Sequence, residues 1–472
     1  MPKARRPLWL ILLGTSVLVA PQTAFAQSTL DQSTQSTREK VLEERLLKLE
    51  AEMAALRADL GATRSEQAQT AVAASQAAVR SEETATKLAT LESRPAGPAE
   101  GFRVGSTTFK LGGFVKVVGI ATRYDDGEVP GGSLGKEFYL PQQIPVGGQS
   151  SRDIIGHARQ TRLAFSASTP LGDKDLKSVI EFDFALAAAP LGAQRATNPY
   201  VPTFRRGFIH YGNWLIGQEW TTFQNPAHLP ETTDFVGPMD GAIFVRQMMI
   251  QYRQPLGDGL DLYLAAENPQ TETESRLSPA LVDNDQDRIP DLVTKLAYKG
   301  TFGDVHIAAL VRQLSVQNNG VGDTAFGWGV TTGGKIPFGP KGRHDLRFLA
   351  TYGHGMGRYF TVGFAPDAIY DAAVDNRLHV VNNFAGFAAL KLGWTPTIRS
   401  TLMVGYQHVD YPTGIIIPGM SNLEAYSFAG NLFWSPVRNL DFGIEYRHAQ
   451  REVVSGLKGQ MDRVEMAAKY TF

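Results

Sequence analysis

Two arginines, Arg206 and Arg246, stand on either side of a proline-bearing segment, residues 221–242. A guanidinium group stays charged at any working pH and holds a carboxylate through two parallel hydrogen bonds. Two such groups close to a narrow passage would attract small anions. The first chemistry that the sequence predicts is therefore the recognition of carboxylate groups.

Other charged residues share the alternation parity that we assign to an aqueous face. Arg162 and Arg253 add positive charge there, whereas Glu219 would dilute a preference for anions. Further bases on this face or at its rim are Lys116, Lys295, Arg347, Lys391, Arg447 and Lys469. Acids share it too, namely Glu181, Asp183, Asp345, Asp441, Glu445 and Glu465. An inward arginine is therefore a candidate either for a solute ligand or for one half of an ion pair in the wall.

One acidic loop has part of the pattern of a calcium site. Asp283, Asp285 and Asp287 place three carboxylates at alternate positions, as a calcium-binding loop does. The glycine expected at the sixth position is Arg288, and the closing glutamate is Thr294. The missing ligands favour a solvated acidic loop over a metal site.

Motifs of enzymes are absent from the sequence. There is no Gly-x-Ser-x-Gly, no His-Glu-x-x-His and no phosphate-binding loop, and the 9 histidines include no pair at metal-ligand spacing on one element. His354 and His379 fall in expected loops, where a lone histidine is usually solvated. We expect no catalytic residues and no cofactor.

Segments with a strict two-residue alternation must position the charged residues. In residues 440–447, Leu, Phe, Ile and Tyr alternate with Asp, Gly, Glu and Arg. The last segment, 463–472, alternates in the same way and ends on Phe472. An apolar face and a charged face with period two are typical of a transmembrane β-strand between lipid and an aqueous lumen. A charged inward face predicts a lumen that holds water instead of a packed core.

The connections between these segments alternate in length. Seven short, turn-rich connections fall at 170–173, 211–213, 255–259, 299–300, 337–341, 395–397 and 435–437. Eight longer loops fall at about 125–155, 187–202, 221–242, 268–289, 316–323, 355–379, 412–421 and 452–459. Together they join 16 strands, and closure is required because an unpaired backbone group in lipid costs about several kcal/mol. The fold class is therefore an all-β transmembrane barrel of 16 antiparallel strands over residues 110–472.

The N-terminus predicts export. Lys3, Arg5 and Arg6 precede an apolar stretch, Leu8 to Ala20, and Ala24-Phe25-Ala26 is a small-residue cleavage site. Residues 1–26 are predicted to be a signal peptide, with an uncleaved anchor helix as the alternative. Its removal takes away three basic residues and no acid, so the formal net charge of −1 becomes −4.

A coiled coil is predicted for residues 38–94, after a flexible stretch at 27–37. Core positions recur with spacings of four and three from Leu42 through Leu60 to Leu91. Alanine, threonine and glutamine fill the middle of this stripe, so a frayed leader is the alternative. Residues 95–109, which begin Pro-Ala-Gly-Pro, are the expected linker.

Composition agrees with an exported membrane barrel. The chain has 0 cysteines, 47 glycines and 25 phenylalanines, and its mean hydropathy is only −0.17. Hydropathy stays low in such barrels because half of each strand faces water. A soluble multi-domain β protein is the alternative, and the mild charge gives no indication of nucleic-acid binding.

Several motifs resemble those of the DcaP-like trimeric porins. They are Gly112-Gly113-Phe114-Val115-Lys116 in the first strand, 158–163 in the second, Gly217 to Phe223 entering the third long loop, Arg246-Gln247 opening the sixth strand, and 287–292 before the eighth. The likeness covers nearly the whole mature chain. Where members of the family often carry a small residue between Gln218 and Trp220, this chain has Glu219.

The resemblance implies an outer-membrane homotrimer with the coiled coil in the periplasm, and passive uptake of small hydrophilic, often anionic solutes such as dicarboxylates. It also implies that loop 221–242 folds inward as the constriction. Two alternatives stay open. One is a cation-preferring or general porin, and the other is a barrel whose coiled coil mainly tethers the outer membrane to the cell wall through peptidoglycan contact.

Overall fold

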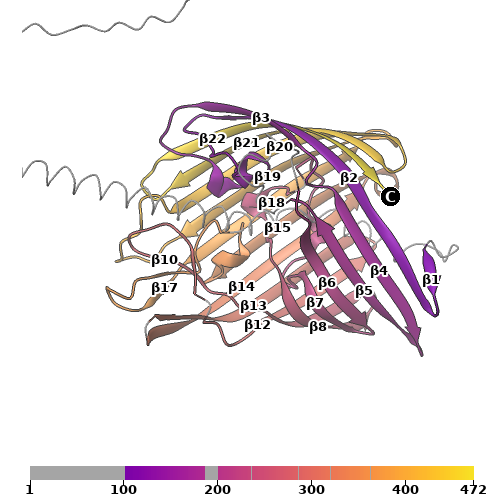
Figure 1. Cartoon of the computed structure of the whole chain (residues 1–472), viewed down its shortest axis with the longest axis horizontal. Coiled ribbons are helices and arrows are strands. Elements are labelled where there is room, and N and C mark those ends of the chain that lie inside the picture. Colours follow the sequence, from indigo (N-terminus) through magenta and orange to yellow (C-terminus); the bar gives the residue numbers. More distant parts are fainter. Residues whose placement is uncertain (1–100, 186–199, 235, 285, 319, 362) are drawn as a thin grey trace, which may run out of the picture. The chain divides into compact units, whose positions relative to one another are not determined.

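The computed structural model describes residues 101–472 except 186–199, 235, 285, 319 and 362 (Figure 1). The predicted signal peptide, the stretch 27–37, the coiled coil 38–94 and residues 95–100 lie outside the described residues. Within the expected linker 95–109, a short strand β1 (Phe102–Val104) pairs with the first residues of β2, which begins at Thr107.

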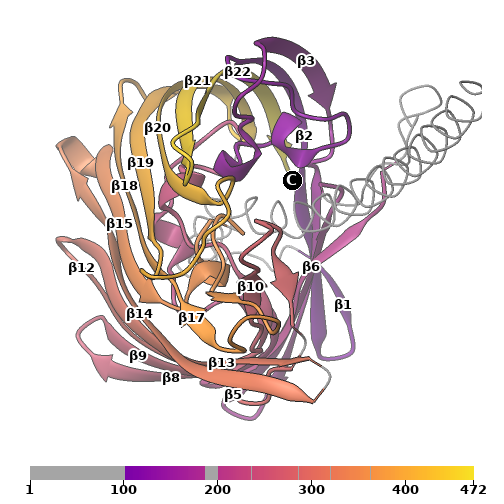
Figure 2. The ribbon, with the colours of Figure 1, turned by 90° about the vertical axis from the view of Figure 1, so that its left-hand side faces the viewer.

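The wall is a closed antiparallel barrel of sixteen strands (Figures 1 and 2). It closes where β2 pairs with β22. In one wall position, β3 and β4 act as two pieces of one strand, because β2 pairs with β3 along 118–124 and with β4 along 108–114. The strands are β2 (Thr107–Tyr124), β3 (Ser151–His157), β4 (Arg162–Leu171), β5 (Lys174–Asp183), β6 (Thr203–Tyr211), β7 (Trp214–Trp220), β8 (Arg246–Gly257), β9 (Leu260–Glu267), β12 (Asp291–Gly300), β13 (Gly303–Asn318), β14 (Val321–Phe338), β15 (His344–His354), β18 (Asn382–Gly393), β19 (Ile398–Asp410), β20 (Asn422–Val437), β21 (Leu440–Val453) and β22 (Lys458–Thr471).

The predicted alternation is confirmed. On β21, Phe442, Ile444 and Tyr446 are exposed on the outside of the barrel, whereas Glu445 and Arg447 are buried inside it. Leu402, Val404 and Tyr406 on β19 and Phe428, Leu432 and Trp434 on β20 continue this apolar outer belt. The pattern identifies which side of each strand faces lipid because successive side chains of a strand point to opposite faces.

Five of the seven short turns lie at the predicted residues. The turns predicted at 299–300 and 435–437 lie directly after those residues, at 301–302 and 438–439, because β12 and β20 continue to Gly300 and Val437. Asp258 and Gly259, which join β8 to β9, both have positive φ, and such residues suit the tight turn of a hairpin. The prediction of one longer loop is wrong. Instead of a loop at 316–323, β13 and β14 continue to Asn318 and Val321, and only two residues separate them. The polar residues there extend a hairpin, and polarity alone does not distinguish an exposed strand from a loop.

The second strand also differs from its prediction. Residues 158–161 fall between β3 and β4 instead of within a strand, and four residues there span three on β2. The extra residue interrupts the ladder, as a β-bulge does.

Smaller elements belong to the connections. Strands β10 (Glu272–Glu274), β11 (Val282–Asp283), β16 (Ala368–Tyr370) and β17 (Leu378–Val380) form a separate four-stranded sheet. Viewed along the barrel, β10 and β17 lie within the ring of wall strands (Figure 2). The short 3-10 helices are η1 (Leu134–Lys136), η2 (Pro141–Gln143), η4 (Pro226–His228), η5 (Met239–Gly241), η6 (Pro340–Gly342) and η7 (Gly357–Tyr359). In the part of the chain that the structure describes, no helix has the length and apolar character needed to cross a membrane.

The prediction that water fills the whole lumen needs correction. Connections 125–150, 221–245 and 355–381 contribute Phe138, Tyr139, Phe223, Phe244 and Phe360 to a shared apolar core. Inward side chains in the middle of the wall, such as Met403, Ser427 and Glu465, are buried, and Ser427 donates to Asp240 of the second connection. Accessible inward residues gather instead near the short-turn end of β4 to β13. The alternation pattern describes only the strands, so it does not predict the apolar loop residues that pack inside the barrel.

A charge placed in the middle of the apolar belt should destabilise the barrel. Val404 and Val437 are similarly exposed, at 54% and 60%, but Val404 lies within β19 and Val437 ends β20 beside a short turn. We expect Val404→Lys to cost about 2–4 kcal/mol and Val437→Lys about 0–1 kcal/mol, because the cost depends on depth in the bilayer. Urea unfolding in lipid vesicles measures both, and equal costs would contradict the assignment of the belt.

Candidate functional site

The connection between β7 and β8, residues 221–245, enters the lumen and is called the inserted loop. Its first residues are fixed by one buried carboxylate, Glu267. The Thr221 hydroxyl donates to Glu267 Oε2 at 2.7 Å, and the Thr222 N–H donates to Oε1 at 2.6 Å. Asn225 then caps η4 by accepting from the Ala227 N–H at 3.1 Å. The loop therefore leaves β7 in a defined direction.

The middle of the inserted loop is bonded to distant parts of the wall. Lys116 on β2 donates to the Thr233 carbonyl at 2.6 Å, and the Thr233 N–H donates to Glu445 on β21 at 3.1 Å. Arg347 on β15 donates to the Leu229 carbonyl. Contacts with strands on several sides mean that the loop crosses the lumen, so the structure bears out its expected inward position.

Charged and hydroxyl side chains hold the loop on the β18–β20 side. Glu231 pairs with Lys391 at 3.0 Å and with Arg399, and Ser427 donates to Asp240 at 2.9 Å. Burial opposes ionisation of Glu231, but the two cations hold the pKa of this loop carboxyl well below its usual range. Glu231 is therefore ionised and keeps this end of the loop attached by charge.

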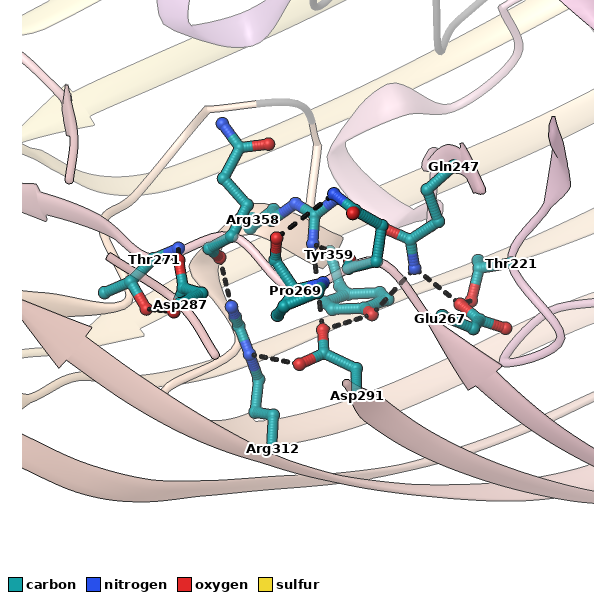
Figure 3. Close-up of polar contacts among 12 residues, drawn as sticks. Thr221, Gln247, Glu267, Pro269, Thr271, Asp287, Asp291, Arg312, Arg358 and Tyr359 are labelled. Atoms are coloured by element: carbon teal, nitrogen blue, oxygen red, sulfur yellow. Dashed lines mark hydrogen bonds and ion pairs between the residues drawn. The ribbon is translucent and has the colours of Figure 1, made fainter. Parts of the chain in front are cut away.

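A second segment, residues 355–381, is attached to β12 and β13 of the wall through the polar network in Figure 3. Arg312 on β13 lies 3.4 Å from Asp291 on β12. Arg312 also donates to Asp367 at 2.9 Å. The Tyr359 hydroxyl donates to Asp291 at 2.7 Å and accepts from Gln247 at 3.0 Å. Gln247 also donates to Glu267, the residue that fixes the start of the inserted loop. One buried polar network thus joins both segments to the wall.

The arginines singled out in the sequence form part of a compact cluster on β4 to β8. Arg162 lies 3.4 Å from Glu181, and Arg206 pairs with Glu219 and lies 3.6 Å from Glu181. Arg246 donates to the Arg205 carbonyl at 2.9 Å and stacks over Trp220. The structure therefore brings Arg162, Arg206, Arg246 and Glu219 together.

Arg205 is a member of this cluster that sequence reasoning missed. The register shifts between Glu181 and Phe182 on β5, opposite residues 204–206 of β6, so Arg205 and Arg206 both face inward. Arg205 is fully buried and pairs with Asp183. A run of two arginines in a strand hints at a bulge, because regular alternation would place one of them in lipid. Four arginines and three carboxylates give the cluster a net charge of +1.

Most inward bases have an acid as neighbour. Arg347 donates to Asp345 at 2.6 Å, Arg447 lies 2.9 Å from Glu445, and Lys469 lies 3.3 Å from Asp441. These contacts favour the ion-pair interpretation of the inward arginines over that of free solute ligands. Inward position alone does not identify a residue that a solute contacts.

A cavity of about 330 Å³ lies beside the arginine cluster, below the inserted loop. Its charged lining residues are Arg206, Glu219, Arg253, Asp261, Lys295, Lys299 and Asp304. Arg253 is half exposed and lies 2.8 Å from Asp261. Lys295 donates to the Gln224 carbonyl at 3.1 Å and lies over the Tyr263 ring. Arg253 thus lines the cavity together with two lysines of β12. The sequence placed Lys295 among the bases of the aqueous face, whereas sequence reasoning missed Lys299.

The acidic loop does not form a metal site among the described residues. Asp287 accepts from the Thr271 N–H at 2.7 Å and from its hydroxyl, while Asp283 accepts from Gln270 at 2.7 Å. Asp285 lies outside the described residues. Across the rest of the described chain, no group of three or more His, Cys, Asp or Glu residues is arranged to hold a metal ion.

Comparisons with known proteins find one matching family and several similar barrel structures. The family model described as DcaP outer membrane protein matches residues 143–472. The crystal structure of the outer membrane channel DcaP of Acinetobacter baumannii is similar with a TM-score of 0.63 and 23% identity, over 79% of this chain and 100% of that chain. In vitro folded OmpT, an outer membrane protein of Vibrio cholerae, gives a TM-score of 0.49 and 10% identity, over 79% and 100% of the chains. No curated protein matches.

Removal of the Asp291 charge should detach residues 355–381 from the wall. Asp291→Asn leaves Arg312 and Arg358 without a shared buried carboxylate, and breaking a buried ion pair costs about 3–5 kcal/mol. Limited proteolysis of the folded barrel should then cut this segment faster, whereas Asp410→Asn at the exposed end of β19 should leave the rate unchanged. An unchanged rate in Asp291→Asn would contradict the role of the network.

Proposed function

Because the chain belongs to the DcaP outer membrane protein family, we propose that its porin-type barrel is a diffusion channel for small hydrophilic anions. Dicarboxylates are the proposed solutes. The observation that carries this proposal is the cavity beside the inserted loop, where four bases face three acids. The inserted loop is the constriction, since it crosses the lumen next to that cavity.

The proposed solute contacts are the accessible bases of the cavity. Arg253 and Lys295 lie where a solute can reach them, and a carboxylate can form charge-assisted hydrogen bonds with both types of side chain. Arg162, Arg206 and Arg246 act at longer range, because their neighbours are already carboxylates or the Trp220 ring. A small solute with two carboxylates can contact both of these cations at once, whereas a solute with one carboxylate contacts them less well.

Glu219 limits the anion preference in this proposal. Its carboxylate is bonded to Arg206 and accepts from the Trp220 N–H at 2.8 Å, so its charge is largely balanced within the cluster. The alternative, a cation-preferring or general porin, requires that the acids of the cavity outweigh its bases. A wall tether through the predicted coiled coil is a second alternative, which the described residues do not address.

Reversal potentials in planar bilayers under a KCl gradient test the selectivity. We expect modest anion preference in the wild type and a clear decrease in Lys295→Gln with Arg253→Gln, because these changes remove the accessible positive charge. Arg206→Ala with Arg246→Ala should also shift the ratio toward cations, because the net charge of the cluster then changes from +1 to −1 and Glu219 loses its arginine partner. Lys177→Gln on the exposed end of β5 is the matched control. Cation preference in the wild type would overturn the proposal.

We also propose a homotrimer, as the family resemblance implies, with outer-membrane lipid around it. The predicted heptads at 38–94 would strengthen the trimer and would not be needed to build the barrel. Native mass measurement in mild detergent should give trimers for the full chain. Deletion of 38–94 should leave trimers that dissociate at a lower temperature. Monomers of the full chain in mild detergent would contradict this assembly.

A further inference from the structure

Two histidines join the inserted loop to the wall at the edge of the cavity. Nδ1 of His228, at the end of η4, lies 3.0 Å from Nδ1 of His306 on β13. Nε2 of His228 lies 3.0 Å from Asp304 Oδ1, also on β13, and 3.0 Å from Asn225 Nδ2. Both imidazoles are buried, and their rings lie with centroids 4.9 Å apart. This contact is one of the attachments of η4 to the wall, beside those of His228 and Asn225 to Asp304.

The contact depends on a single shared proton. Two neutral imidazoles hold one hydrogen between their Nδ1 atoms, so one ring donates and the other accepts. One added proton still leaves an acceptor, because the rings can exchange tautomers. When both rings are imidazolium, both Nδ1 atoms carry hydrogen and neither can accept. Loss of the contact therefore requires two protons.

The charges around the pair are mostly positive. Asp304 on β13 is the acid next to His228, and Lys335 on β14 is its cross-strand neighbour. Lys295 on β12 and Arg347 on β15 also act on His228, and burial together with these cations keeps the pKa of this loop histidine below its usual value. A doubly charged pair would face three cations and two carboxylates, and the second carboxylate, Asp345, is already paired with Arg347 at 2.6 Å and lies 4.0 Å from Lys335. Such an arrangement repels the loop from the wall.

We propose that the His228–His306 contact is an acid-released latch that holds the η4 end of the inserted loop against β13. At neutral pH the latch is closed and the loop narrows the lumen. In acid both rings are charged, the contact breaks and η4 moves away from the wall. The inference that this changes flux rests on the proposed channel function, whereas the movement of the loop does not.

Single-channel recordings between about pH 7 and about pH 4 test the latch, since this range begins above the ordinary pKa of an imidazole and extends well below it, as burial requires. A two-proton latch predicts that the occupancy of a larger-conductance state rises by up to about 100-fold per pH unit. His306→Gln leaves one titrating ring and should reduce this to at most about tenfold. His228→Gln with His306→Gln should abolish the response. His344→Gln, which changes a histidine at the start of β15, should keep the wild-type response.

A spin label on the cysteine-free chain measures the movement without any conductance. Ala227→Cys places the label in η4 beside His228, on the lining of the cavity. The label should become more mobile in acid in the wild-type background and stay immobile with His228→Gln and His306→Gln. If the double variant fails to assemble, both measurements are made with His306→Gln alone, because this change leaves the loop sequence intact.

Two results would overturn the latch. One is a label that stays immobile in acid while the wild-type conductance changes, since the pH effect would then act on the permeating ions. The other is a double variant with the full wild-type pH response. Absence of conductance at every pH, with a label that still responds, would refute the channel function and leave the latch in place.

Discussion

Backbone hydrogen bonding in lipid is the constraint on which this structure depends. No water is available there to satisfy an N–H or C=O group, so every wall strand must pair on both sides. Sixteen strands meet this requirement by closing β2 on β22. Closure then fixes an interior of limited width, and any segment that enters it must satisfy its own polar groups against the inward face of the wall.

The inserted loop shows how that second requirement is met. It is irregular, yet its backbone groups find partners among wall side chains, as Thr233 does with Lys116 and Glu445. Irregular backbone at membrane depth is tolerated where protein surrounds it. The charged inward face of the strands therefore has a structural use, because it supplies donors and acceptors for the loops that occupy the lumen.

This use separates structural charges from those available to a solute. Inside a barrel that is partly filled by loops, most arginines lie beside a carboxylate, as Arg205 does with Asp183 and Arg347 with Asp345. A buried pair contributes little to selectivity, since its field is largely balanced locally. Cations that remain accessible, such as Arg253 and Lys295, lie at the short-turn end, where the loops leave a cavity. The same residue types therefore serve two purposes: buried charged pairs stabilise the structure, and accessible cations beside the cavity contribute to selectivity.

The sequence by itself determined the wall of this protein. Period-two alternation on β19 to β22 and turn residues such as Asp258-Gly259 are local signals, so the strand count, the turns and the outward face could be predicted. The motifs between 112 and 292 also indicated the family that the family model matches. The extended hairpin of β13 and β14 escaped prediction, because polar residues of a strand resemble those of a loop.

Only the tertiary structure decided how the lumen is filled and which charges meet. Lys116 and Thr233 are 117 residues apart, and Thr233 and Glu445 are 212 apart. Contacts over such separations depend on the closed barrel, and no periodic pattern in the sequence indicates them. The bulge that turns Arg205 inward and the pairing of His228 with His306 arise in the same way. Alternation specifies the face on which a side chain lies, but only the folded barrel specifies its partner.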